Sequence, residues 1–184
     1  MKYLLEGEES KRLSFRKVKF SDFLEWLPFH EEPLSSQYWS GLPNDPKVAC
    51  EEQFRTIFQR YEEGSGGMNA LILKSESKLA GLCGLLVQMV DGQQELEIGY
   101  SILPEYWGAG LATEAAHKCK EIAFSNKWSS SLISIIHIDN LPSQKVALKN
   151  GMRLDKTTTY TKKFIDFKSS RTLYVNRSKI NIIY

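Results

Sequence analysis

Two glycines separated by one residue, Gly108 and Gly110, stand between a strand-like segment and an alanine-rich segment that begins at Leu111. The first backbone N–H groups of a helix have no partner within the helix, and the helix dipole places partial positive charge beside them. Small residues in front of such a helix allow these amides to close around a phosphate group. Residues 95–116 therefore predict a strand, a tight turn and a helix that together bind the pyrophosphate of a ligand.

Two other interpretations of the glycine pair have to be weighed. A short glycine motif also occurs in turns that merely join a strand to a helix. A dinucleotide-binding oxidoreductase would show a third glycine and an acid about 20 residues further along. Thr113 occupies the third glycine position, and Asp139, the acid after the next strand, comes later than that spacing. The antiparallel strands expected before the turn also disfavour this fold.

The elements that must position the glycine turn follow from periodicity and from turn and cap signals. An acid before a proline, Asp45-Pro46, marks the start of a long helix. Tight turns at 75–78 and 91–92 join three strands into an antiparallel meander. The predicted elements are a strand within 11–19, a short helix after 21–22, a helix at 46–61, strands at 69–74, 79–90 and 95–103, a helix at 111–126, a strand at 132–138, a helix at 143–150, and strands at 153–164 and 171–176. This order predicts a single α+β domain, residues 1–184, around a mixed sheet.

Composition narrows the class of protein. The 184 residues carry a formal net charge of +2, from 24 basic and 22 acidic residues, which argues against a general nucleic-acid binder. Residues 1–19 lack the apolar run of a secretory signal, and no segment is long and apolar enough to span a membrane. The three cysteines, Cys50, Cys83 and Cys119, show no metal-binding spacing, so we expect no metal and free thiols in the reducing cytoplasm.

Two sequence blocks carry a resemblance to a known family. The run Trp107-Gly-Ala-Gly-Leu-Ala112 resembles the coenzyme-A-binding motif Gln/Arg-x-x-Gly-x-Gly/Ala of the GNAT acetyltransferase superfamily, with Trp107 at the Gln/Arg position. Its continuation, and the block from His137 to Met152, are similar to the branch of RimJ/RimL ribosomal-protein N-acetyltransferases. The opening strand, with Arg12 and Arg16, resembles that branch more weakly. The resemblance follows the chain in order over nearly its whole length.

The resemblance implies a three-layer α/β/α fold. Its mixed, mostly antiparallel sheet would splay between two parallel strands, here 95–103 and 132–138, and hold the pantetheine arm of the cofactor in the gap. Acetyl-CoA would be the acetyl donor, and the acceptor would be a primary amine, either a peptide N-terminus or a small molecule, attacking directly in a ternary complex. The alternative is a non-catalytic module of the same fold that binds coenzyme A or a partner protein. The oligomeric state is left open, with a homodimer as the default expectation.

The resemblance also implies the cofactor contacts. Backbone groups of 101–103 would pair with the pantetheine arm, and the amides of 108–113 would hold the pyrophosphate. Asn140 would hydrogen-bond the pantetheine, although a turn residue that closes the strand is the alternative. The implied cofactor-binding residues are Ser101, Ile102, Leu103, Trp107, Gly108, Ala109, Gly110, Leu111, Ala112, Thr113, Asn140 and Ser143.

Two residues are candidates for the chemistry itself. Ser143 occupies the position proposed in this branch to protonate the leaving sulfur. Many other relatives use a tyrosine four residues later, but that position is Ala147 here, a departure that favours Ser143 for this role. Capping of the short helix is the alternative role for Ser143. Glu97 is the candidate general base, since alternation along its strand places it on one face with Glu95 and Gly99. A solvated or salt-bridged strand carboxylate is the alternative for Glu97.

Further side chains are weaker candidates for the ligand sites. Lys145 and Lys149 would approach the 3′-phosphate of the cofactor as point charges. Tyr160 could line the acceptor pocket, with packing in the hairpin as the alternative. His137 is a second candidate base, with a hydrogen-bonded histidine at the end of a strand as the favoured alternative. The aromatic residues that flank the predicted loop 31–45 could form a wall of the acceptor site, with ordinary core packing as the default; they are Trp26, Phe29, Tyr38 and Trp39. Glu31 and Glu32 would attract a cationic amine there.

Overall fold

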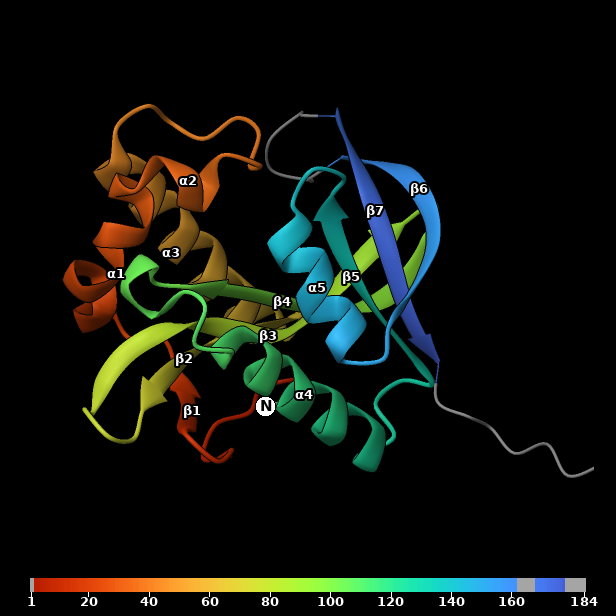
Figure 1. Ribbon diagram of the computed structural model, residues 1–184, viewed down its shortest axis with the longest axis horizontal. Helices are drawn as coiled ribbons and strands as arrows, with labels where there is room; N and C mark the ends of the chain where they lie inside the picture. The colour runs from red at the N-terminus through yellow and green to blue at the C-terminus, as the bar shows by residue number, and fades with distance from the viewer. Residues whose placement is uncertain (1, 162–167, 178–184) are drawn as a thin grey trace, which may run out of the picture.

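A computed structural model describes residues 2–161 and 168–177 and arranges them as helices packed around one sheet (Figure 1). The strands are β1 (Leu13–Lys17), β2 (Gly66–Leu73), β3 (Lys78–Val90), β4 (Gln93–Ile102), β5 (Ser131–His137), β6 (Arg153–Thr161) and β7 (Lys168–Arg177). The helices are α1 (Phe23–Glu31), α2 (Pro33–Ser36), α3 (Pro46–Glu63), α4 (Leu111–Ser125) and α5 (Leu141–Lys149). Single 3-10 turns at Phe20–Asp22 and Pro104–Tyr106 precede α1 and follow β4.

The described strands form one seven-stranded sheet in the order β1-β2-β3-β4-β5-β7-β6. Neighbouring strands run antiparallel, except that β4 and β5 are parallel. Within the described part of the chain, β4 and β5 share a single residue pair, Glu97 with Ile133, and then separate. The predicted mixed sheet, splayed between two parallel strands, is therefore confirmed.

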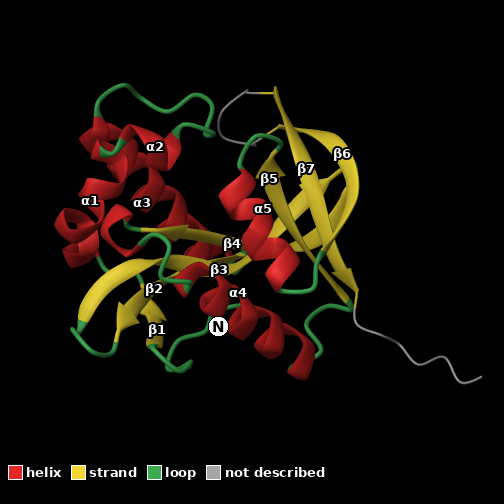
Figure 2. Ribbon diagram, in the orientation of Figure 1, coloured by secondary structure: helices red, strands yellow, loops and turns green. Residues whose placement is uncertain are grey.

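The sheet lies between two helical layers (Figure 2). Side chains alternate between the faces of β4, so Leu96 and Ile98 pack with Leu111 and Ala115 of α4. The opposite face packs against α1 and α3, where Trp26 and Phe54 belong to a second apolar cluster. Burial of one face against α4 holds β4 in place, while the opposite face of this strand, with Glu97, Gly99 and Ser101, is only half-buried. The end of β4 sets the position of the turn that leads into α4 (Figure 1).

Helix α3 begins as its sequence signals predict. The side chain of Asp45 caps it, because Oδ1 accepts hydrogen bonds from the N–H groups of Lys47 at 2.8 Å and Val48 at 3.5 Å. Val48, in the first turn of α3, does not face the core, since the residue is 41% exposed. At 3.6 residues per turn, Val48 lies about 120° around the helix from the buried Phe54.

Replacing Asp45 by alanine should lower the free energy of unfolding by about 1 kcal/mol, the usual cost of losing an N-cap. Urea unfolding monitored by circular dichroism measures this change. The control is Glu51→Ala, which removes an exposed acid from the interior of the same helix and should change stability by less than about 0.5 kcal/mol. Equal losses in the two variants would contradict the capping role of Asp45.

Several element boundaries differ from the sequence prediction. The predicted loop 31–45 contains the one-turn helix α2, whose N-cap is the side chain of Glu32. Helix α5 begins at Leu141 rather than at 143. Of the predicted strand 153–164, residues 162–164 lie outside the described residues. No helix of the described chain is long and apolar enough to cross a membrane, and no group of His, Cys, Asp or Glu within it is arranged to hold a metal ion.

Candidate active site

The glycine turn, residues 107–110, joins the 3-10 turn after β4 to helix α4. Gly108 and Gly110 have φ angles of 75° and 78°, in the left-handed region that favours glycine. Gly110 is the N-cap of α4, and no side chain caps the helix there. The first bond of the helix runs from Glu114 N–H to the Gly110 carbonyl at 3.2 Å. Helix α4 therefore begins directly after the turn, and no side chain covers the backbone N–H groups at its N-terminus.

The first amides of α4 are the donors that the sequence predicts for a phosphate. Leu111, Ala112 and Thr113 precede the first helical hydrogen bond, and the described residues provide no acceptor for their N–H groups. Ala109 differs, because its N–H donates to the Tyr106 carbonyl at 3.4 Å. The arrangement leaves a row of backbone donors at the positive end of a helix dipole, which is the chemistry that a diphosphate requires.

Trp107 ties the glycine turn back to β4. Its indole Nε1 donates to the Ile102 carbonyl at 2.7 Å, while 45% of the residue stays exposed. Trp107, at the Gln/Arg position of the coenzyme-A-binding motif, thus links the glycine turn to β4 through this hydrogen bond. The role predicted for Trp107 toward the cofactor stays a prediction.

Residues 101–103, at the end of β4, are expected to offer their backbone groups to the pantetheine arm, but only one of the three is placed to do so. Both backbone groups of Leu103 are used within the protein, its N–H by the Ala80 carbonyl and its carbonyl by Tyr106 N–H, each at 3.0 Å. Ser101 lies opposite Leu82 of β3, and because backbone groups alternate in direction along a strand, its groups point to β3 like the N–H of Leu103. The expectation that Ser101 and Leu103 pair with the pantetheine arm is therefore corrected.

Alternation turns the backbone of Ile102 toward the gap between β4 and β5. The same side of β4 carries the Ile98 carbonyl, which accepts a hydrogen bond from Ser134 Oγ of β5 at 2.9 Å. This bond lies one residue beyond the single pair of the parallel ladder. Ile102 N–H therefore points into this gap, on the side of β4 where an extended ligand could pair with the strand.

The start of α5 brings Asn140 and Ser143 together. Asn140 is the N-cap, and its Oδ1 accepts the N–H of Ser143 at 3.1 Å. The interpretation of Ser143 as the cap is therefore wrong, because the helix begins two residues before it, at Leu141. The Ser143 carbonyl accepts a hydrogen bond from Tyr100 Oη at 2.8 Å, which bridges β4 and α5. Ala147, at the tyrosine position of other relatives, is only 1% exposed and packs in the core.

Glu97 projects from β4 on the face that carries Gly99 and Ser101. Its Oε2 accepts a hydrogen bond from Gln88 Nε2 at 2.6 Å, and its Oε1 accepts one from Ile135 N–H at 3.3 Å. Within the described chain no cation pairs with Glu97 in an ion pair. Each carboxylate oxygen retains a lone pair, so the side chain is oriented and can still accept a proton.

A cleft of about 1280 Å³ lies between α3 and strands β4 and β5. Three of the predicted site residues, Glu97, Asn140 and Ser143, line this cleft. The glycine turn lies outside it. The residues that line the cleft from the other elements are Tyr38, Trp39, Glu52, Gln53, Thr56, Arg60, Glu63, Gln88, Ser134 and His137, among others.

The predicted wall of aromatic residues is partly corrected. Trp26 and Phe29 are buried in the core with their rings stacked at 4.6 Å, so they do not face the cleft. Tyr38 and Trp39 do line it, and the Tyr38 ring stacks on His137 at 5.2 Å. Glu31 and Glu32 do not line the cleft, whose acids come from α3 and β4 instead. The side chain of Tyr160 lies outside the described residues.

Residues 12–153 match the family described as an acetyltransferase (GNAT) domain. The chain belongs to the GNAT acetyltransferase family. This GNAT protein is 31% identical over 128 residues to the uncharacterized protein YkkB of Bacillus subtilis, covering 68% of this chain and 72% of YkkB. As the family implies, it is an acetyltransferase that takes its acetyl group from acetyl-CoA.

Solved structures share the fold of this GNAT acetyltransferase. An acetyltransferase from Agrobacterium tumefaciens superposes with a TM-score of 0.76 at 20% identity, covering 97% of this chain and 98% of its own. RimJ of Mycobacterium smegmatis, solved in complex with CoA-disulfide, superposes with a TM-score of 0.69 at 17% identity, covering 94% and 88% of the two chains. At these identities the likeness establishes the fold alone.

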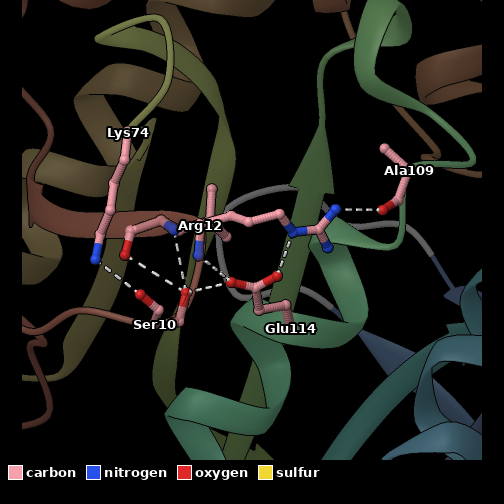
Figure 3. Close-up of polar contacts among 6 residues, drawn as sticks. Ser10, Arg12, Lys74, Ala109 and Glu114 are labelled. Carbon is pink, nitrogen blue, oxygen red and sulfur yellow. Dashed lines mark hydrogen bonds and ion pairs between the residues drawn. The ribbon is translucent and has the colours of Figure 1, made fainter.

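A polar cluster of this GNAT acetyltransferase lies at the base of the glycine turn, and its members are far apart in the sequence (Figure 3). Glu114, in the first turn of α4, accepts hydrogen bonds from Ser10 and Arg12, which precede β1. Burial acts to raise the pKa of Glu114, but these hydrogen bonds outweigh it and lower the pKa below its usual value. Arg12 belongs to the opening segment named above, and Glu114 follows the glycine motif by two residues. No spacing rule connects residues about 100 positions apart.

Proposed function

We propose that this GNAT acetyltransferase transfers the acetyl group of acetyl-CoA to the nitrogen of a primary amine, by direct attack in a ternary complex. The observation that carries the proposal is the cleft between α3 and strands β4 and β5, which places Glu97 and Ser143 on one surface beside the splayed strands. Its volume of about 1280 Å³ exceeds the roughly 300–1,000 Å³ of an ordinary ligand pocket. There is room for the reactive end of the donor and an acceptor at the same time.

The residues that would hold acetyl-CoA fit its chemistry. The amides of Leu111, Ala112 and Thr113, which have no acceptor in the described part of the chain, suit a diphosphate. Ile102 offers a backbone donor at the gap between β4 and β5. The Nδ2 group of Asn140 complements this set, because its Oδ1 is already committed to the helix cap. Acetyl-CoA supplies an acetyl group activated as a thioester, and Ile102 N–H would polarise its carbonyl.

The proton transfers fall to Glu97 and Ser143. As the new C–N bond forms, Glu97 accepts the proton that the amine nitrogen loses. As the C–S bond breaks, the Ser143 hydroxyl donates a proton to the sulfur, which leaves as the thiol. Solvent then takes the proton from Glu97 and restores that of Ser143, so that both side chains are ready for another turnover.

Two measurements on the purified protein test this function. About 1 mM acetyl-CoA should stabilise the protein against thermal unfolding by about 2.7 kcal/mol if its Kd is near 10 μM. Free thiol should then be released when an acceptor is added, and mass spectrometry should find the acetyl group on its nitrogen. An acceptor panel would contain peptides with free N-termini, amino acids, polyamines and aminoglycosides.

The matched control is each peptide with its N-terminus already acetylated, which should release no thiol. The acceptors that give the highest kcat/KM would define the substrate class. Thiol release that does not depend on an acceptor, or the absence of any thermal shift with acetyl-CoA, would contradict the proposed function.

A further inference from the structure

Arg12 connects the beginning of the chain to the glycine turn, 97 residues later in sequence (Figure 3). Its Nε donates to Glu114 Oε2 at 2.6 Å, and its Nη1 donates to the Ala109 carbonyl at 2.8 Å. Its backbone N–H and the Ser10 hydroxyl both donate to Glu114 Oε1, at 2.7 Å each. One guanidinium therefore holds both the first turn of α4 and the peptide in front of it.

The contact with the Ala109 carbonyl has a consequence for the next residue. The peptide bond between Ala109 and Gly110 is trans, so its C=O and N–H groups point in opposite directions. When Arg12 holds the Ala109 carbonyl on its own side, the N–H of Gly110 is directed to the other side of the turn. Gly110 itself has a φ of 78°, a flexible position at which an unrestrained peptide could rotate.

The contact between Arg12 and Glu114 neutralises a carboxylate that lies beside the expected diphosphate site. A carboxylate in the first turn of a helix is attracted to the same N-terminal amides that a diphosphate would use, and it repels an anionic ligand. Here both oxygens of Glu114 are engaged by Ser10 and Arg12. The charge of Glu114 is thus neutralised by Arg12 and kept away from the amides of Leu111, Ala112 and Thr113.

We propose that Arg12 is a positioning residue for the diphosphate of acetyl-CoA, acting through the Ala109–Gly110 peptide and Glu114. This inference rests on the proposed function. Arg12 does not touch the diphosphate itself but orients the backbone donors. The Gly110 N–H and the first amides of α4 donate hydrogen bonds to the diphosphate. Lysine cannot replace it, because an ammonium group lacks the planar fork that reaches two acceptors at fixed angles.

The test compares two ligands in Arg12→Gln and Arg12→Lys. Titration calorimetry would measure the Kd of acetyl-CoA and of S-acetylpantetheine, which keeps the pantetheine arm and lacks the diphosphate. Both variants should bind acetyl-CoA about 10-fold or more weakly, the loss expected for a charge-assisted hydrogen bond. Both should bind S-acetylpantetheine within about twofold of the original protein, because the arm lies at β4 and β5.

Arg16→Gln is the matched control. Arg16 lies in β1, four residues after Arg12, and likewise holds a carboxylate, since it donates two hydrogen bonds to Asp22 at 2.7 and 2.9 Å, but it does not contact the glycine turn. Arg16→Gln should lose a similar ion pair and bind both ligands as the original protein does. Thermal melts of the free proteins would show that the variants are folded, and Arg12→Lys serves if Arg12→Gln does not fold.

The outcomes separate the inference from the proposed function. If the original protein does not bind acetyl-CoA, the proposed function is wrong, and the positioning role of Arg12 is then wrong as well. If it binds and both Arg12 variants retain its affinity, the positioning role alone is overturned. Equal weakening of acetyl-CoA and S-acetylpantetheine would also overturn it, since that result indicates a general structural role.

Discussion

Replacing Gly110 by valine should abolish measurable acetyl-CoA binding in a protein that still folds. Gly110 has a φ of 78°, where a β-branched residue is strongly disfavoured, so the turn would rearrange and move the first amides of α4. Losing two hydrogen bonds to a charged ligand, each worth about 1.5–3 kcal/mol, corresponds to roughly a 100-fold or greater rise in Kd. Titration calorimetry, together with the loss of thermal stabilisation by acetyl-CoA, measures this effect.

Gly92→Val separates loss of binding from backbone strain. Gly92 has the same φ of 78° in the turn between β3 and β4, and a Cβ there would meet nothing within 4 Å. A Cβ on Gly110 is similarly unhindered, with Arg12 Nη2 nearest at 3.7 Å. Both variants should therefore lose similar stability, but Gly92→Val should bind acetyl-CoA normally. Unchanged affinity in Gly110→Val would show that the glycine turn does not hold the cofactor.

Replacing Glu97 by glutamine should lower kcat by about 100-fold or more while leaving the Kd of acetyl-CoA nearly unchanged, as expected for the loss of a general base. Glutamine keeps the volume of the side chain, and its carbonyl oxygen can still accept the N–H of Ile135. It cannot take a proton from the amine. Steady-state kinetics with the best acceptor of the panel, followed as thiol release, measures the change.

Glu95→Gln is the control for this substitution. Glu95 lies on the same face of β4, two residues earlier, but it does not line the cleft. The kcat of Glu95→Gln should stay within about twofold of the original, because Glu95 lies outside the cleft and cannot take a proton from an amine bound there. If Glu97→Gln keeps full kcat across the pH range, another group or a water molecule takes the amine proton, and the assignment of Glu97 is wrong.

The elements around the glycine turn were predictable because their signals are local. Asp45 before a proline marked the start of α3, and Gly108 with Gly110 marked the turn that leads into α4. Alternating apolar residues along β4 predicted the face on which Glu97 lies. Each of these features depends on the backbone preferences of a few consecutive residues.

Other features of the candidate site depended on where a neighbouring segment ends or packs. The cap of α5 is Asn140 rather than Ser143, because Leu141 and Pro142 enter the helix. Leu103 is unavailable to a ligand, because its backbone is used by Ala80 and Tyr106. Trp26 and Phe29 turned out to be core residues, since α1 packs them against α3 and the sheet.

By itself the sequence determined the order of the elements, the glycine turn and the family, because hydrophobic period, caps and a compact motif are encoded by residues close together in the chain. Tertiary structure decided which groups share the cleft with Glu97, and that Arg12 reaches Ala109 and Glu114 at the base of the turn. The physical reason is that hydrogen bonds and ion pairs act over a few ångströms of space. Residues about 100 positions apart become partners only after the sheet brings β1 beside the start of α4.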